Sequence, residues 1–169
     1  FNAIRDTGNK LLAILDPHDS VGILDQYSYD IKYFKEYEIF DRYLEKEKRL
    51  GSAQRVHFIS ICSPNYLHDA HIRTALRVGA DAICEKPLVL NPWNLDALHQ
   101  LELETNRKVF TILQLRVHPS IILLKNRIEK EKAKKKYEIE LTYVTSRGDW
   151  YLRSWKGNVQ YSGGIASNI

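Results

Sequence analysis

The chain has 169 residues, of which 44% are hydrophobic and 27% are charged, and its formal net charge is +4. This composition is typical of a globular protein, and the length is enough for one domain and part of another. No apolar run is as long as a membrane-spanning helix, so we expect neither a membrane segment nor a signal peptide.

The positive charge is concentrated in residues 125–136, where lysines and arginines outnumber glutamates. We interpret this tract as a solvated helix end and turn. A nucleic-acid site would need interleaved aromatic residues or a recognisable module, and the tract has neither. We therefore expect no nucleic-acid partner.

In chain order, residues 1–7 have the pattern of a helix tail that ends at Gly8. Residues 11–15 form a continuous apolar run, which fits a buried parallel strand. A short helical segment is expected at 20–27 and a brief strand at 32–34. Because the chain lacks an initial Met and starts inside a helical pattern, we expect it to be a fragment of a longer protein.

The next segments alternate between helix and strand. Charged and apolar residues recur at helical spacing in 37–50, and the apolar run 56–61 predicts a strand. This repeating order predicts an α/β fold with a Rossmann-like, doubly wound parallel sheet that lacks its first strand. The remaining predicted elements are a helix at 66–78 stopped by Gly79, a strand at 81–84, a helix from Asn91-Pro92 to Thr105 with Asn91 as N-cap, and a strand at 108–115.

The pattern changes after Arg116. Residues 119–130 predict an amphipathic helix, and residues 137–146 alternate as a half-exposed strand of an antiparallel sheet does. Residues 147–164 are expected to form a long polar and aromatic loop, and such loops tend to be functional. We therefore divide the chain into a dinucleotide-binding domain, 1–116, and the beginning of an α+β substrate-binding and oligomerisation domain, 117–169.

Both cysteines, Cys62 and Cys84, lie in or at the end of apolar strands. We interpret them as free, buried thiols of a protein in the reducing cytosol, with a disulfide between neighbouring strands as the alternative.

Asp16 directly follows the first apolar run. In a dinucleotide-binding fold an acidic residue at this position accepts hydrogen bonds from the adenosine ribose, and its charge repels a 2′-phosphate, which favours NAD over NADP. The alternative is a helix cap. The sequence contains no glycine-rich phosphate-binding turn.

The segment 62–68 follows the second clear strand. Pro64 and Asn65 shape a turn, and the next helix offers free N–H groups to a polar ligand, although a plain strand-to-helix cap fits the spacing equally well. His68, Asp69 and His71 resemble metal ligands, but Arg73 is near and a third strong ligand is missing, so we expect no metal.

Lys86 lies in Glu85-Lys86-Pro87, directly after the strand 81–84. Oxidation of an alcohol needs a base beside the reacting carbon, and a lysine can act as one if burial or a neighbouring cation favours its neutral form. Glu85 would hold the lysine or touch the cofactor, and Pro87 fixes the chain, with a cis Lys86-Pro87 bond as one means. The alternative is an exposed lysine in a β-α turn.

Two further groups of residues are candidates for ligand binding. Gln114 and Arg116 are two apart near the end of the predicted strand 108–115, so we expect them to face the same way, with Arg116 able to hold a carboxylate or phosphate. The alternative for Arg116 is a surface position. The final loop combines cations with flat rings, which suits a nucleotide-sugar or a contact between subunits: Arg147, Trp150, Tyr151, Arg153, Trp155 and Lys156.

These motifs resemble the Gfo/Idh/MocA oxidoreductases, two-domain NAD(P)-dependent enzymes. The matching segments are 61–68, 70–72, 75–76 and 79–88, which include the family's Glu-Lys-Pro run, and the resemblance covers essentially the whole chain. Within the family the chain is most similar to dehydrogenases that oxidise UDP-N-acetyl-glucosaminuronic acid at C3, in the synthesis of sugars of bacterial surface polysaccharides. That narrower resemblance lies in residues 19–23, 113–116, 141–148, 150–151, 154–157 and 162–169.

The resemblance implies specific roles. Lys86 is the catalytic lysine, and a catalytic histidine is expected beyond Ile169. The resemblance implies NAD as the cofactor, a UDP-sugar as the substrate and a homo-oligomer, dimer or tetramer, and we expect the protein to be cytoplasmic. The alternatives are dehydrogenation of another sugar or cyclitol, and a non-catalytic NAD-binding regulator. The implied cofactor residues are Asp16, Ser63, Asn65, His68, Glu85, Lys86 and Gln114, and the implied substrate residues are Lys86, Arg116, Tyr143, Arg147, Trp155, Ser162 and Asn168.

Overall fold

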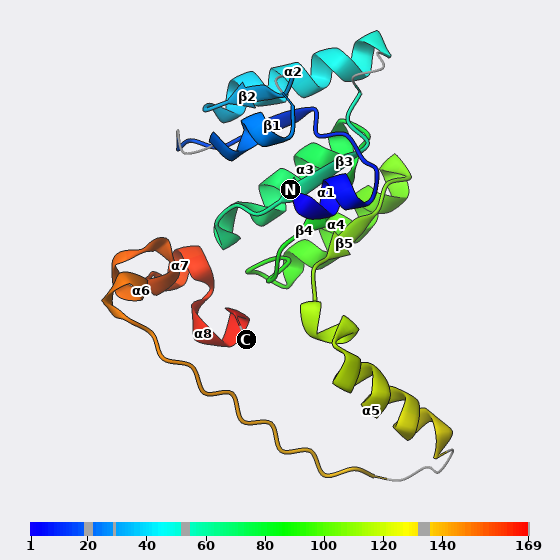
Figure 1. Ribbon diagram of the computed structural model, residues 1–169, viewed down its shortest axis with the longest axis vertical. Helices are drawn as coiled ribbons and strands as arrows, with labels where there is room; N and C mark the ends of the chain where they lie inside the picture. The colour runs from blue at the N-terminus through cyan, green and yellow to red at the C-terminus, as the bar shows by residue number, and fades with distance from the viewer. Residues whose placement is uncertain (19–21, 29, 52–54, 132–135, 169) are drawn as a thin grey trace.

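The computed structural model describes residues 1–18, 22–28, 30–51, 55–131 and 136–168 (Figure 1). Its strands form two parallel sheets. The first pairs β1 (Ala13–Leu15) with β2 (Lys32–Phe34), and the second has the order β3 (Phe58–Ile61), β4 (Asp81–Cys84), β5 (Val109–Thr111). This is the strand order of a doubly wound sheet without its central strand, so the predicted fold class is confirmed.

Helices and helical turns connect and cover these strands. Gly8 and Gly79 end α1 and α3 with left-handed φ angles of 72° and 78°, as the sequence predicts. Residues 20–21 of the expected helical segment 20–27 lie outside the described residues. The elements are α1 (Asn2–Asp6), η1 (Gly22–Gln26), α2 (Tyr37–Leu50), η2 (Asn65–Leu67), α3 (His68–Arg77), α4 (Trp93–Thr105), η3 (Gln114–Val117), α5 (Pro119–Lys130), α6 (Asp149–Arg153), η4 (Trp155–Gly157), α7 (Val159–Ser162) and α8 (Gly164–Asn168).

The main core lies between the three-stranded sheet and helices α3 and α4. Apolar residues of α3 recur at positions that share one helix face, and that face is buried. Burying a side chain of this kind stabilises the fold by roughly 1.5–3 kcal/mol. The cluster consists of Ile61, Ile72, Ala75, Leu76, Ala82, Cys84 and Leu98.

Helix α2 joins the two sheets. On one side Phe34 of β2 packs against its aromatic residues Phe40 and Tyr43. On the other side its Leu44 forms a second buried cluster with Val78 and Ala80, which follow α3. The first sheet is therefore held to the second through α2.

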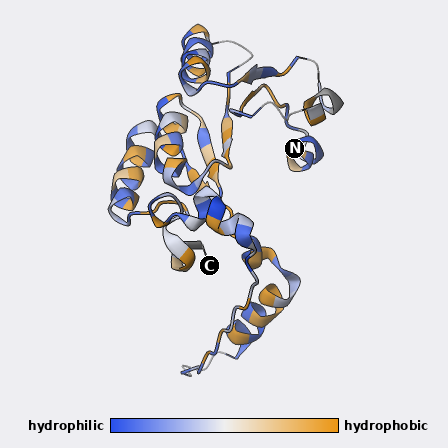
Figure 2. Ribbon diagram, turned by 90° about the vertical axis from the view of Figure 1, so that its left-hand side faces the viewer, coloured by the Kyte–Doolittle hydropathy of each residue, from blue (hydrophilic) through white to orange (hydrophobic). Residues whose placement is uncertain are grey.

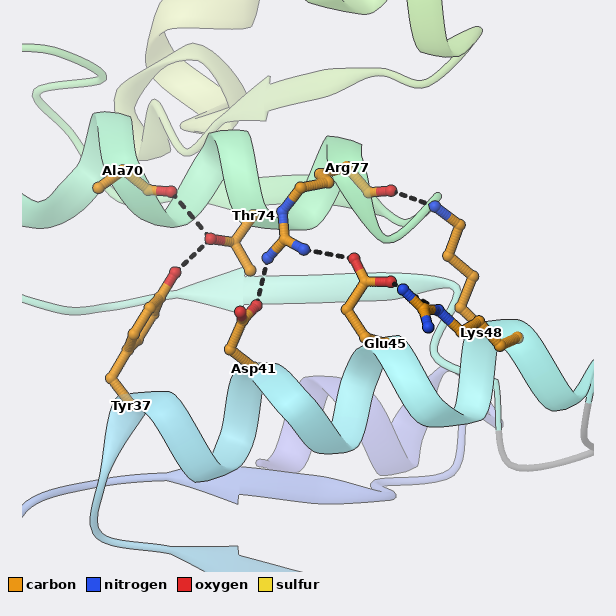
Figure 3. A network of polar contacts seen from close by, with 8 residues as sticks. Tyr37, Asp41, Glu45, Lys48, Ala70, Thr74 and Arg77 are labelled. Carbon is orange, nitrogen blue, oxygen red and sulfur yellow. Dashed lines mark hydrogen bonds and ion pairs between the residues drawn. The ribbon is translucent and has the colours of Figure 1, made fainter.

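A polar network crosses from α2 to α3 (Figure 3). The Arg77 guanidinium donates to the carboxylates of Asp41 and Glu45, and Lys48 Nζ donates to the Arg77 carbonyl oxygen at 2.5 Å. The Tyr37 hydroxyl bonds to that of Thr74 at the other end of the interface. The network fixes the lateral position of α2 on α3.

The prediction of an antiparallel strand at 137–146 is wrong. Both sheets among the described residues are parallel, and residues 136–148 form an exposed, extended segment without strand pairing. Ile139 and Leu141 are 84% and 85% exposed. Alternation predicts which side chains share a face, but a strand exists only through backbone hydrogen bonds to a neighbour, and the described residues supply none here.

The prediction of a loop at 147–164 is also wrong. This segment folds into short helices that return toward α3 (Figure 1). Ser154 and Asn158 cap two of them, accepting hydrogen bonds from the N–H groups of Lys156 at 3.3 Å and Gln160 at 2.9 Å. These caps are a local signal of helices, which the prediction from the composition of the segment did not use.

Helix α5 has the predicted bounds and projects away from the sheets (Figures 1 and 2). Its hydrophobic residues show the same colours as the core in Figure 2, yet they are exposed. Among the described residues, no helix combines the length and the apolar character needed to cross a bilayer.

Candidate functional site

The turns that follow β3, β4 and β5 lie at one edge of the sheet. Ile61, Cys84 and Thr111 are aligned across the three parallel strands. The ladder continues past the strand ends, because the Glu85 N–H donates to the Ile61 carbonyl at 3.0 Å and the Ile112 N–H donates to that of Cys84 at 2.9 Å. In open α/β sheets, ligands bind at this edge.

The turn after β3 carries Ser63 and Asn65. The Ser63 hydroxyl forms a hydrogen bond of 2.9 Å with Nδ1 of His71, in α3. Asn65 is buried, and its Nδ2 donates to the carbonyl of Ser162, in α7, at 2.8 Å. Tyr66 packs on Tyr161 with ring centroids 4.7 Å apart. The turn is thus tied to both halves of the chain.

His68 joins this turn to the one after β4. It is fully buried, with 0% exposure. Its Nδ1 lies 2.7 Å from the Pro87 carbonyl oxygen, and its Nε2 lies 2.8 Å from the Ser63 carbonyl oxygen. Both ring nitrogens therefore face backbone oxygens of the rim.

The turn after β4 holds Glu85 and Lys86, both half-buried. The Lys86 N–H donates to Oε2 of Glu85 at 3.3 Å, and the Lys86-Pro87 bond is cis. Glu85 therefore contacts the backbone of the lysine it was expected to hold. We use the name rim cluster for the residues of these two turns together with the partners described above: Ser63, Asn65, His68, Glu85, Lys86 and Ser162.

Asp16 lies at the carboxyl end of β1, as predicted. Its Oδ1 accepts from the His18 N–H at 2.8 Å, and its carbonyl accepts from the Tyr33 hydroxyl at 2.7 Å. The carboxylate thus closes a turn two residues long and caps no helix among the described residues, and it lies at the strand end that a ribose ligand requires.

Gln114 and Arg116 are not on a strand, so the prediction that they face the same way is wrong. β5 ends at Thr111, and both residues lie exposed in η3. A 3₁₀ helix has three residues per turn, so residues two apart point in different directions.

The substrate residues expected in the second half have varied settings. Ser162 is buried, its hydroxyl donating to the Asn158 carbonyl and accepting from the Gly164 N–H, at 2.9 and 3.0 Å. The Arg147 guanidinium lies 4.3 Å from the Tyr151 ring centroid. Trp155 is half-buried with Lys156 Nζ 5.7 Å from its ring, Tyr143 is exposed, and Asn168 lies in α8, its side chain outside the description.

His71, which the sequence suggested only as a weak candidate for a metal ligand, contacts Ser63, a contact that was not predicted. Its ring stacks on Tyr37, with centroids 5.2 Å apart and planes at 13°. Burial and then the charge of His68 lower the pKa of His71 from its ordinary value of 6.5. The sequence offered one signal for the position of His71: it lies three residues after His68, and residues three apart share a helix face.

The cysteines are free, as expected, but only Cys84 is buried; the expectation that Cys62 is buried too is wrong, because it is exposed just past the end of β3. Burial, followed by the charges of Cys62 and Glu85, raises the pKa of Cys84 to about 12. Among the described residues, no cluster of His, Cys, Asp and Glu is arranged to hold a metal ion.

The rim residues fit part of a dinucleotide site. A carboxylate ends β1, and hydroxyl, amide, carboxylate and ammonium groups follow β3 and β4. Such groups suit ribose hydroxyls and a reacting ring, whereas the pyrophosphate requires a glycine-rich turn, which the sequence does not contain.

Comparison with known proteins agrees with this geometry. A family model described as an oxidoreductase family with an NAD-binding Rossmann fold matches residues 2–113. The WlbA (WbpB) dehydrogenase of Thermus thermophilus, solved with NAD and UDP-GlcNAcA, is 48% identical with a TM-score of 0.91, and the match covers 99% of this chain and 53% of that chain. Its complex with NAD and alpha-ketoglutarate gives 45% identity and a TM-score of 0.89 over the same shares.

A more distant structure shares the fold. The WlbA dehydrogenase of Bordetella pertussis, solved with NADH and UDP-GlcNAcA, is 18% identical with a TM-score of 0.79, covering 98% of this chain and 48% of that one. The chain spans about half the length of these solved proteins. The matched Rossmann fold and the Thermus identity together show that the chain belongs to the Gfo/Idh/MocA family of oxidoreductases.

Proposed function

We propose that the protein containing this chain is an NAD-dependent dehydrogenase that oxidises the C3 hydroxyl of UDP-N-acetyl-glucosaminuronic acid to a 3-keto sugar. The observation that carries the proposal is the position of Lys86, in a half-buried turn at the carboxyl edge of the sheet and within the rim cluster. The similarity to a dehydrogenase solved with NAD and UDP-GlcNAcA supports this choice of cofactor and substrate.

The chemistry divides between cofactor and protein. Bound NAD supplies the hydride acceptor for the C3 hydrogen. Lys86 Nζ would take the proton of the C3 hydroxyl, which must leave the oxygen when the alcohol becomes a ketone. Glu85 contacts the backbone of Lys86 and keeps it at the rim.

The remaining roles follow from the family resemblance. Asp16 binds the adenosine ribose and disfavours NADP. Ser63, Asn65, His68, Glu85 and Gln114 lie along the NAD path. Arg116 pairs with the uronate carboxylate, and the other residues assigned to the sugar nucleotide are Tyr143, Arg147, Trp155, Ser162 and Asn168.

We extend the proposal to the whole protein. Residues 1–116 belong to the dinucleotide-binding domain, and residues 117–169 begin the substrate-binding and oligomerisation domain. The protein works in the cytoplasm as a dimer or tetramer. Its product enters the synthesis of lipopolysaccharide O-antigen sugars.

The test offers NAD and a panel of UDP-sugars, free sugars and cyclitols to the full-length protein and follows nicotinamide absorbance. Turnover with the UDP-uronic acid and none with free sugars is expected. If the protein neither binds nor oxidises any UDP-uronic acid, the substrate assignment is wrong.

Lys86→Ala tests the assigned role. We expect turnover to fall by roughly 10²–10⁴-fold, the contribution typical of a positioned base, while titration calorimetry shows NAD affinity little changed. Lys125→Ala, on the exposed face of α5, is the matched control and should keep normal turnover. If NAD binding disappears with Lys86→Ala, the lysine is instead a cofactor residue.

A further inference from the structure

The starting observation is the surroundings of the His68 ring. Its two nitrogens lie 2.7 and 2.8 Å from the carbonyl oxygens of Pro87 and Ser63, and the residue has no exposed surface. Both distances are those of true hydrogen bonds. The ring therefore bridges two turns that follow different strands.

The chemistry of the partners determines the charge of the ring. Backbone carbonyl oxygens only accept hydrogen bonds, whereas a neutral imidazole has one N–H donor and one lone pair. A neutral ring would place its lone pair against a carbonyl oxygen in a buried site, where an unmade hydrogen bond costs about 1–3 kcal/mol. Only the imidazolium form donates to both oxygens, and such charge-assisted bonds are short and strong.

The neighbouring groups agree with a positive ring. Nδ1 of His71, in the same helix, makes its hydrogen bond with the Ser63 hydroxyl, which can donate to a neutral ring. The two histidine rings of this helix therefore face different partners, two carbonyl oxygens for His68 and a hydroxyl for His71.

We propose that His68 is a positioning residue, held as an imidazolium that ties the turn carrying Lys86 to the turn carrying Ser63. The ring fixes the backbone of both turns. The distance between Lys86 Nζ and the residues that line the cofactor path therefore stays constant. The effect on catalysis rests on the proposed function, whereas the charge of the ring does not.

The first test measures the charge directly. ¹⁵N NMR of the histidine-labelled full-length protein at neutral pH, with His68 assigned through its sequence neighbours, should show two protonated ring nitrogens, with couplings across both hydrogen bonds. A ring with one unprotonated nitrogen would overturn the imidazolium, and this result does not depend on turnover.

The second test measures positioning. We expect His68→Gln to lower kcat by about 10²-fold, the loss typical of a misplaced reacting group, while KM for the sugar nucleotide stays within about twofold. His99→Gln, on the exposed side of α4, is the control and should leave both constants unchanged. Unchanged kcat in a folded His68→Gln protein would refute the positioning role.

A third variant is used if His68→Gln does not fold. His68→Ala leaves a space for a small cation, and added imidazole should restore part of kcat; no restoration in a folded variant counts against the proposal. If the unaltered protein shows no turnover with any sugar while the NMR signature is present, the proposed function fails and the imidazolium remains.

Discussion

Helices α3 and α5 have apolar residues at similar spacing, but the structure treats them differently. In α3, Ile72 and Leu76 are 0% and 1% exposed, whereas in α5 Leu123 and Leu124 are 69% and 52% exposed. The spacing predicts both helices correctly. Burial, however, depends on a covering element, and only α3 has a sheet on one side and a second helix beside it.

The same contrast separates the two strand-like segments. Residues 81–84 pair on both sides and become β4, while residues 137–146 pair with no described residue and stay extended. The comparison teaches that a repeating pattern predicts local structure, and that the contribution to stability comes from contacts between elements.

The largest expected effect compares the two helices directly. Ile72→Ala should lower the free energy of unfolding by about 2–5 kcal/mol, because it leaves a cavity in a closed core. Leu123→Ala in α5 should change it by no more than about 0.5 kcal/mol, since it removes an exposed side chain. Urea denaturation followed by circular dichroism measures both, and equal effects would show that α5 is covered in solution.

An intermediate effect concerns ion pairs. Arg77→Ala breaks the network with Asp41 and Glu45, and we expect a loss of about 1 kcal/mol at low salt that shrinks at high salt. Arg127→Ala, in an exposed pair with Glu131, should cause no measurable change. Urea denaturation at two salt concentrations measures the free energy of unfolding of both variants and its dependence on salt. A loss at Arg77 that salt does not reduce would exclude the ionic explanation.

The smallest effect comes from His71. Since its pKa is lowered in the folded protein, the unfolded chain binds more protons around and below pH 6.5. The free energy of unfolding should therefore decrease as the pH falls through 6.5 toward the folded pKa, and be unaffected by this group above it. His71→Gln should flatten that part of the pH profile, and an identical slope in the variant would contradict the assignment.

Much of the fold was predictable because its signals are local. The helices 37–50 and 119–130 and the strand 81–84 have the expected bounds, since capping, proline and apolar runs are read within a few residues. Strand pairing is not local, and this is why the antiparallel strand was predicted wrongly. Gln114 and Arg116 were misplaced because β5 ends early.

The candidate site was predictable in its location more than in its contacts. The strand-end position of Lys86 follows from the sequence alone. The two carbonyl partners of His68 and the bond from Asn65 to Ser162 join segments that only the folded chain brings together. The sequence therefore indicates that the turns after β3 and β4 meet at the rim, and the structure shows which residues of these turns hold the others.

The most direct test of the central claim is a crystal structure of the full-length protein with NADH and UDP-N-acetyl-glucosaminuronic acid. The account predicts Lys86 Nζ within hydrogen-bond reach, about 2.6–3.2 Å, of the C3 hydroxyl oxygen. A complex in which Nζ points away from the sugar, with another side chain at that oxygen, would contradict it.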